Sequence, residues 1–163
     1  MSNTLDISVK VAAEAETIAV AARLAPHLKP GDVLTLNGTL GAGKTAFARA
    51  LIRSMCGGEI EVPSPTFNLL LTYDSPVGPI YHYDFYRLED PEEVWELDIE
   101  DAYDQAITIM EWVEKLEDLA PKDVLKITLS IPDEGGDMAR FIQIEGHDGW
   151  KNRLQTIELG QQV

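Results

Sequence analysis

The chain has 163 residues, 45% of them hydrophobic and 25% charged, proportions that are ordinary for a soluble globular protein. No apolar run approaches the roughly 20 residues that span a bilayer, and the first residues lack the basic and apolar segments of a secretory signal. The single cysteine, Cys56, excludes an internal disulfide and fits a reducing compartment. We therefore expect one domain, residues 1–163, in the cytoplasm and without a membrane segment.

The formal net charge of −15 is concentrated in one part of the chain. Within residues 84–123, 15 side chains are Asp or Glu and 3 are Lys or Arg, a local net charge of −12. Such a surface repels the phosphate backbone of a nucleic acid. Any role in nucleic-acid biology should therefore pass through a protein partner, although a solvated acidic face that aids solubility explains the charge equally well.

The first predicted elements are an amphipathic helix and a buried strand. Apolar residues recur at helical spacing before Pro30-Gly31, which end the helix. These residues are Ile18, Ala21, Ala22, Ala25 and Leu28. Residues 33–36 then form a short, almost wholly apolar strand of the kind that is buried on both faces of a sheet.

A second amphipathic helix follows a glycine-rich turn, and Gly57-Gly58 end it. Its apolar face consists of Phe47, Ala48, Leu51, Ile52 and Met55. Residues 68–73 and 80–85 are predicted strands separated by a turn at 74–79.

The remaining chain predicts a helix start, an apolar strand and a late hairpin. Asp90, Pro91 and the two glutamates that follow are typical of a helix N-terminus. Residues 107–110 form the apolar strand. Residues 125–131 alternate between apolar and polar and should pair with 140–145, across a turn at 132–137, as an antiparallel hairpin. Strands alternate with helices early and hairpins come late, which predicts an α/β domain with a mixed sheet flanked by helices.

Residues 38–45 match the phosphate-binding motif GxxxxGK[ST] in full, between a predicted strand and a predicted helix. Glycines in such a loop adopt φ > 0 and bring backbone N–H groups close to phosphate oxygens, and the helix dipole favours the same anion. Lys44 can reach the β- and γ-phosphates, and the Thr45 hydroxyl is placed to bind Mg²⁺. The motif predicts a P-loop NTPase-type domain. Its nucleotide-binding residues are Gly38, Leu40, Gly41, Ala42, Gly43, Lys44 and Thr45.

Two predicted strands end in acids that could serve the metal, as hydrolysis requires. Strand alternation places His82 and Asp84 on one face, and Glu111 follows the strand at 107–110. Ligands bind at the carboxyl ends of strands in open α/β sheets. Spacing alone does not choose between Asp84 and Glu111 as the metal ligand, and either could instead cap a helix or join an ion pair. His82 by itself is expected to be a packed structural histidine.

Two further positions carry alternative interpretations. A hydroxyl within residues 64–67 (Ser-Pro-Thr-Phe) could contact Mg²⁺ or the γ-phosphate and order that loop when a triphosphate binds, or the segment could be an ordinary proline turn. Arg87 could stabilise transition-state charge, or it could pair with Glu92 or Glu93.

Taken together, four segments resemble the TsaE (YjeE) family, bacterial ATPases of tRNA threonylcarbamoyladenosine (t6A) biosynthesis. The segments are residues 40–45 (LGAGKT), 62–67 (VPSPTF), 81–88 (YHYDFYRL) and 111–112 (EW). The resemblance implies an ATPase of weak intrinsic activity that works with TsaB and TsaD, the proteins that modify adenosine 37 of tRNAs decoding ANN codons. It also implies that tRNA is reached only through those partners.

The resemblance assigns roles to individual residues of this chain. Lys44 and Thr45 would hold phosphate and Mg²⁺, with Glu111 as the likelier second metal ligand. Asp84 becomes an acid that supports hydrolysis of ATP, and Thr66 becomes a switch residue. Trp112 is expected near the nucleotide. The catalytic set implied in this way is Asp84, Thr66 and Glu111, and the metal set is Thr45 and Glu111.

A small-molecule kinase is one alternative function, because P-loop kinases share this size and fold. Such enzymes usually close an arginine-rich lid over their substrates, and basic residues are sparse after the second helix. Release of phosphate to water, rather than transfer to added nucleosides or nucleotides, would separate the two functions.

A GTPase switch is a second alternative. Residues 133–136 formally match DxxG, but they lie in the predicted hairpin turn, and no guanine-reading Asn-Lys-x-Asp motif occurs. A nucleotide-gated binding module, whose own hydrolysis is incidental, is a third alternative that overlaps with the family resemblance.

Overall fold

The computed structural model describes residues 4–39, 41–58, 60–65, 67–134 and 136–159. Within them, seven strands form one sheet in the order β1-β7-β6-β2-β5-β4-β3. The strands are β1 (Leu5–Val11), β2 (Val33–Asn37), β3 (Leu70–Ser75), β4 (Gly78–Asp84), β5 (Ile107–Glu111), β6 (Leu125–Ser130) and β7 (Arg140–Gly146). The α-helices are α1 (Glu14–Leu24), α2 (Lys44–Cys56), α3 (Ile99–Gln105) and α4 (Asp148–Leu154). Short 3₁₀ helices are η1 (Ala25–His27), η2 (Pro91–Glu96) and η3 (Val113–Leu119).

The sheet is mixed, with a parallel centre and antiparallel edges. Strand β2 pairs in parallel with β5 and β6, and β4 pairs in parallel with β5. The pairs β3–β4, β6–β7 and β1–β7 are antiparallel. The α/β class with a mixed sheet is therefore confirmed, as is the late hairpin formed by β6 and β7.

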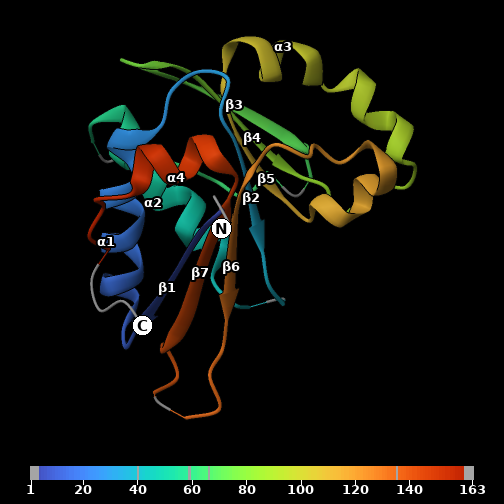
Figure 1. The fold of residues 1–163 in the computed structure, drawn as a ribbon. Coiled ribbons are helices and arrows are strands. Elements are labelled where there is room, and N and C mark those ends of the chain that lie inside the picture. Colours follow the sequence, from blue (N-terminus) through green and yellow to red (C-terminus); the bar gives the residue numbers. More distant parts are fainter. Residues whose placement is uncertain (1–3, 40, 59, 66, 135, 160–163) are drawn as a thin grey trace.

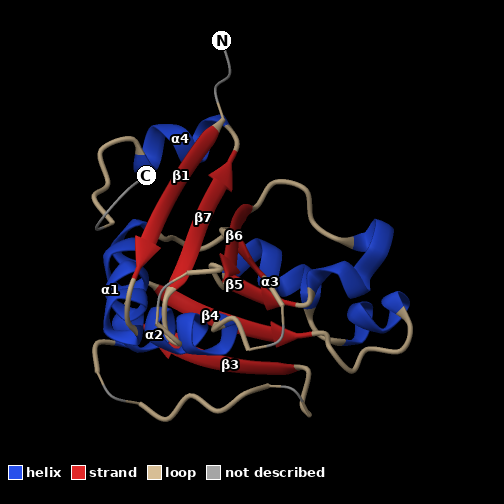
Figure 2. Ribbon diagram, turned by 90° about the horizontal axis from the view of Figure 1, so that it is seen from below, coloured by secondary structure: helices blue, strands red, loops and turns tan. Residues whose placement is uncertain are grey.

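Helices cover both faces of the sheet. Helices α1, α2 and α4 lie on one side, and α3 with η2 and η3 lies on the other (Figures 1 and 2). Alternate residues of β5 fill the two cores: Ile107 and Ile109 pack into the first, and Met110 packs into the second. A strand buried on both faces carries apolar residues at successive positions, which explains why residues 107–110 are apolar apart from the buried Thr108.

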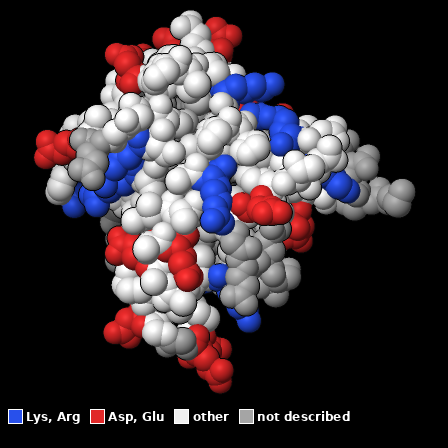
Figure 3. Space-filling view, turned by 90° about the vertical axis from the view of Figure 1, so that its left-hand side faces the viewer, with Lys and Arg blue, Asp and Glu red and all other residues white. Residues whose placement is uncertain are grey.

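The acidic segment occupies one side of the fold. Residues 84–123 include η2, α3 and η3, which lie together at the right of Figure 1. On the side of α1 and α4, Lys and Arg side chains are interspersed with Asp and Glu (Figure 3). Among the residues that the structure describes, no helix has the length and apolar character needed to cross a membrane.

The first helix differs from its prediction in both length and phase. Helix α1 ends at Leu24, and a 3₁₀ turn with a proline in its first turn replaces the predicted continuation to Leu28. Proline has no N–H to donate and disrupts an α-helix interior, which ends α1 before Ala25 and Leu28. Within α1 the buried face lies one position before the predicted face, and Ile18 is 43% exposed. The buried face consists of Thr17, Val20, Ala21 and Leu24.

The helix start at Asp90 is confirmed, because the Glu92 N–H donates to Asp90 Oδ1 at 3.0 Å, but the helix itself is the 3₁₀ helix η2. The predicted turn at 74–79 is tighter than expected, since Ser75 already pairs with Gly78 in the β3–β4 ladder. The elements β1, α3, η3 and α4 are additional to the predicted set.

Helix α4 is fastened to the turn that precedes β2. Both terminal nitrogens of Arg153 donate to the Asp32 carboxylate, Nη1 at 2.8 Å and Nη2 at 2.7 Å, and Nη2 also donates to the His27 carbonyl. The Arg153 guanidinium stacks on the Trp150 ring at 4.3 Å. Asp32 is buried, and its Oδ2 accepts from the Lys29 N–H as well. The ion pair thereby joins the end of the chain to the central sheet.

Arg153→Ala should lower the free energy of unfolding by about 2–3 kcal/mol, because it leaves the buried Asp32 carboxylate without its cation. Urea unfolding followed by circular dichroism measures the change. Asn152→Ala, on an exposed position of the same helix, is the matched control and should stay within about 0.5 kcal/mol of wild type. Equal stability of the two variants would show that the ion pair does not hold α4.

Candidate functional site

The phosphate loop, residues 38–45, connects β2 to α2 at the carboxyl end of the parallel strands. Asp84 and Glu111 are paired in register at the ends of β4 and β5. A cavity of about 350 Å³ lies between these acids and the loop. It is lined by Gly41, Gly43, Lys44, Thr45, Ala46, Asp84, Tyr86, Glu111 and Trp112. The structure thus brings most of the predicted site residues together, whereas Leu40 and Thr66 lie outside the described residues.

The loop has the backbone conformation that its glycines were expected to provide. Gly38 has φ = +142°, and a Cβ atom there would lie 2.3 Å from the Leu129 carbonyl oxygen of β6. Gly43 has φ = +105° directly before the first turn of α2. Both positions therefore require glycine, one for close approach of two backbones and the other for a left-handed conformation.

Lys44 is almost fully buried at the edge of the cavity, and its side chain reaches back to the first residue of the loop. Its Nζ donates to the Gly38 carbonyl at 2.7 Å and lies 3.5 Å from the centroid of the Trp112 ring. Burial lowers the pKa of Lys44, while nearby carboxylates, Glu111 foremost, oppose that shift. A bound anion would favour the charged form in the same way, so the site suits a lysine that meets phosphate.

Glu111 links the phosphate loop to the sheet. Its carboxylate is 1% exposed; Oε1 accepts a hydrogen bond from Thr45 Oγ1 at 3.0 Å, and Oε2 lies 2.7 Å from His82 Nε2. These hydroxyl and carboxylate oxygens are the hard ligands that Mg²⁺ prefers. Among the described residues, no group of three or more His, Cys, Asp or Glu side chains is arranged to hold a metal. A few protein oxygens suit Mg²⁺, which usually keeps waters and substrate phosphates as its other ligands.

His82 is more than the packed histidine expected from its strand. It is fully buried, and its Nδ1 has no hydrogen-bond partner among the described residues. A proton on Nε2 would donate to Glu111 Oε2. The bond fixes the orientation of the Glu111 carboxylate. Strand alternation had already placed His82 on the face of Asp84, which was the available signal.

Asp84 lies beside Glu111 and also organises the turn that follows β4. Its Oδ1 accepts from the Tyr86 N–H at 3.0 Å. The Tyr86 ring packs against Trp112, with 4.9 Å between centroids, and both rings line the cavity. Trp112 thus borders the cavity, and its expected place near a bound nucleotide stays a prediction.

Arg87 lies outside this group. Its guanidinium stacks on the Phe67 ring at 4.5 Å, and Phe67 is 81% exposed. Among the described residues, Arg87 forms no ion pair with Glu92 or Glu93, so the predicted pairing is not found.

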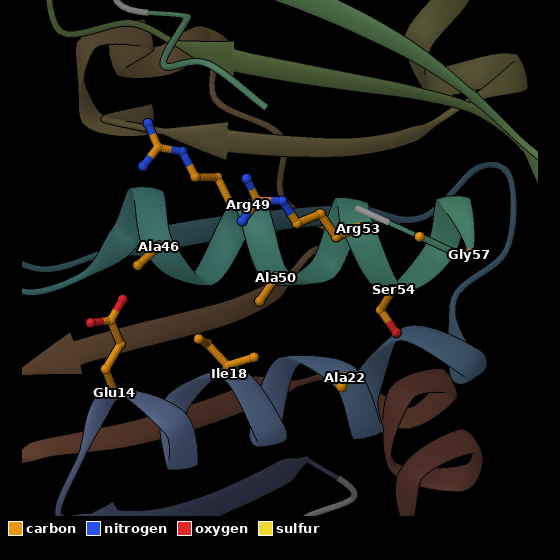
Figure 4. A pocket seen from close by; sticks show the side chains of 10 residues that line it. Glu14, Ile18, Ala22, Ala46, Arg49, Ala50, Arg53, Ser54 and Gly57 are labelled. Atoms are coloured by element: carbon orange, nitrogen blue, oxygen red, sulfur yellow. The ribbon is translucent and has the colours of Figure 1, made fainter. Parts of the chain in front are cut away.

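A second hollow, of about 460 Å³, lies between α1 and α2 and is lined largely by small side chains with Ile18 pointing in (Figure 4). Arg49 and Arg53 project from α2 away from α1. Their Nε atoms donate to the Val62 carbonyl at 2.7 Å and the Ile60 carbonyl at 3.1 Å. The two arginines thus fasten residues 60–62, which lie just before the segment with the predicted switch residue, to the helix that begins at Lys44.

Arg140 contacts the phosphate loop, and the sequence patterns did not indicate this contact. Its Nε donates to the Ala42 carbonyl of the phosphate loop at 2.9 Å. The two residues are 98 positions apart, so no local motif connects them.

Comparison with known proteins now identifies the family. The family model described as threonylcarbamoyl adenosine biosynthesis protein TsaE matches residues 11–140. The chain belongs to the TsaE family. A tRNA threonylcarbamoyladenosine biosynthesis protein TsaE from Rickettsia felis is 43% identical over 146 residues, 90% of this chain and 85% of the relative. The Bacillus subtilis TsaE is 42% identical over 127 residues, covering 78% and 77% of the two chains.

The crystal structure of YdiB from Bacillus subtilis superposes on 93% of both chains, with a TM-score of 0.72 and 30% identity. The TsaE resemblance and the P-loop NTPase-type fold predicted from the sequence are therefore confirmed.

Gly38→Ala should lower the free energy of unfolding by about 2–4 kcal/mol, because the new Cβ would collide with the Leu129 carbonyl at a positive φ. Urea unfolding is the measurement. Gly149→Ala is the matched control, since a Cβ at that helical position meets nothing within 4 Å. This substitution should raise the stability of the protein slightly, because alanine favours the helix more than glycine does. A Gly38→Ala variant as stable as wild type would mean that the loop does not need this backbone conformation.

Proposed function

We propose that this protein is a Mg²⁺-dependent ATPase that supports threonylcarbamoyladenosine formation in tRNA together with TsaB and TsaD. The observation that carries the proposal is the cavity in which Lys44 and Thr45 of the phosphate loop meet Asp84 and Glu111. The TsaE relatives bear the name of this tRNA modification. We extend the proposal to residues 1–163 acting as one domain in the cytoplasm.

The backbone of the loop and Lys44 support the proposed binding of phosphate. The N-terminus of α2 directs its positive dipole end into the cavity, next to Gly41 and Gly43. A polyphosphate there would draw Lys44 Nζ away from the Gly38 carbonyl. The ammonium would then donate to a charged phosphate oxygen in place of a neutral carbonyl oxygen, which makes a stronger hydrogen bond. Thr45 and Glu111 would hold Mg²⁺, which neutralises charge on the β- and γ-phosphates.

The lining of the cavity supports the proposal that the protein alone turns over slowly. Lys44 is the one Lys or Arg among its described lining residues, and Arg87 is turned onto Phe67. P-loop enzymes that lack an arginine at the γ-phosphate hydrolyse slowly until a partner supplies or organises one. Asp84, at the end of β4, is the carboxylate that we assign to supporting water attack, and Thr66 remains the proposed switch residue.

The charge of the surface favours protein partners over direct contact with RNA. Residues 84–123 carry a net charge of −12, and exposed acids of η2 and α3 such as Glu96 and Glu100 belong to them, so this side of the fold repels phosphate backbones. We therefore propose that the protein reaches tRNA through TsaB and TsaD.

A GTPase switch receives no support from the second motif. Asp133 and Gly136 lie between β6 and β7, and neither is among the described residues that line the cavity. Competition of GTP against ATP tests this alternative, and a preference for GTP would contradict the proposed ATPase.

Lys44→Ala should abolish ATP binding, whereas Asp84→Asn should retain binding within about threefold and lose hydrolysis by at least about tenfold. Asparagine keeps an oxygen to accept from the Tyr86 N–H, so the turn after β4 is preserved. Fluorescent-nucleotide titration measures binding, and phosphate release measures hydrolysis with and without TsaB–TsaD. Equal loss of binding in both variants would mean that Asp84 is misassigned. High turnover by the protein alone, unchanged by TsaB–TsaD, would contradict partner dependence.

A further inference from the structure

Arg140, the first residue of β7, directs its whole guanidinium at backbone carbonyls. Nε donates to the Ala42 carbonyl at 2.9 Å, and Nη2 donates to the Gly41 carbonyl at 3.3 Å. Nη1 donates to the carbonyls of Asp137 and Ala139, at 2.9 and 2.6 Å. Two of these carbonyls belong to the phosphate loop and two to the base of the β6–β7 hairpin. One side chain therefore ties the hairpin to the loop.

The Arg140 guanidinium contacts backbone carbonyls specifically, in place of the acidic side chains that a surface arginine usually meets. The chain carries 28 acidic residues, yet among the described residues Arg140 forms no ion pair, and Asp137 offers it a carbonyl rather than a carboxylate. Arginine suits the task because its planar fork can serve several acceptors at once, whereas lysine presents a compact point charge.

Arg140 acts on the loop from outside the cavity. It is not among the described residues that line the cavity, which Gly41 and Gly43 do line. The C=O and N–H of one trans peptide point in opposite directions, so holding the Ala42 carbonyl directs the Gly43 N–H away from Arg140. Backbone N–H groups of a P-loop are the donors that cradle phosphate.

We propose that Arg140 is a positioning residue that sets the peptide orientation of Gly41–Gly43 for a nucleoside di- or triphosphate. This inference rests on the proposed nucleotide site. The guanidinium holds the carbonyl side of the loop so that its N–H side is prepared for the anion before nucleotide arrives. It also couples the loop to residues 137–139, so a change at the base of the hairpin is transmitted to the phosphate site.

The test is titration of a fluorescent ADP analogue into wild type, Arg140→Ala, Arg140→Lys and Arg153→Ala, with thermal melting of each protein. Arg140→Ala should bind roughly tenfold more weakly, since it loses two charge-assisted hydrogen bonds to the loop. Arg140→Lys should fall between it and wild type. Arg153→Ala removes an arginine clamp at the opposite end of the sheet, so it should melt earlier yet bind ADP as wild type does.

Chemical rescue separates positioning from general stability. Millimolar guanidinium should restore ADP binding to Arg140→Ala but not to Lys44→Ala, whose missing group meets phosphate itself. Unchanged ADP affinity in both Arg140 variants would overturn the inference, as would affinity that follows melting temperature across all variants, including Arg153→Ala. Failure of wild type to bind ADP would instead overturn the proposed nucleotide site.

Discussion

The hydrogen bond between Thr45 and Glu111 is the interaction on which the candidate site depends. It joins the first turn of α2 to the end of β5 through a carboxylate that is almost wholly buried. A buried carboxylate is costly unless its oxygens are hydrogen-bonded, and here the second oxygen is met by His82. The sheet must therefore place β4 beside β5, and β5 beside β2, for the three residues to meet. The same strand order brings Asp84 to the cavity.

Contacts outside the cavity support this arrangement. Arg140 holds the phosphate loop to the β6–β7 hairpin, and Arg49 holds residue 62 to α2. Both arginines donate to backbone carbonyls, which orients peptides without placing further charge in the cavity. Among the described residues that line the cavity, Lys44 is therefore the one cation, and it lies beside the carboxylates of Asp84 and Glu111. Such a balance suits an enzyme that we propose to be slow until its partners act.

Elements whose sequence signal lies within a short segment were predictable. The phosphate loop, β2, β5 and α2 follow from glycine spacing and apolar periodicity, and the late hairpin follows from alternation. Local patterns do not reveal long-range contacts: Thr45 and Glu111, 66 positions apart, were brought together only by the family resemblance, and the contact of Arg140 with Ala42, 98 positions apart, was not predicted. The phase of α1 was wrong because the buried face begins at the polar Thr17, one position before Ile18, where the predicted apolar pattern began. Strand β1 was missed although Leu5, Ile7, Val9 and Val11 alternate with polar residues, so the strand was predictable and only its pairing with distant β7 was not. The role of Thr66 stays a prediction.

The most direct test of the central claim is calorimetric titration of ATP into wild type and Glu111→Gln, each with and without Mg²⁺. Glutamine keeps the size of the side chain and an oxygen for Thr45 but removes the charge that would hold the metal. We expect Mg²⁺ to tighten ATP binding to wild type by at least about tenfold, and to have little effect on Glu111→Gln, whose metal-free affinity should match wild type. Full Mg²⁺ dependence in Glu111→Gln would contradict the assignment of Glu111 to the metal.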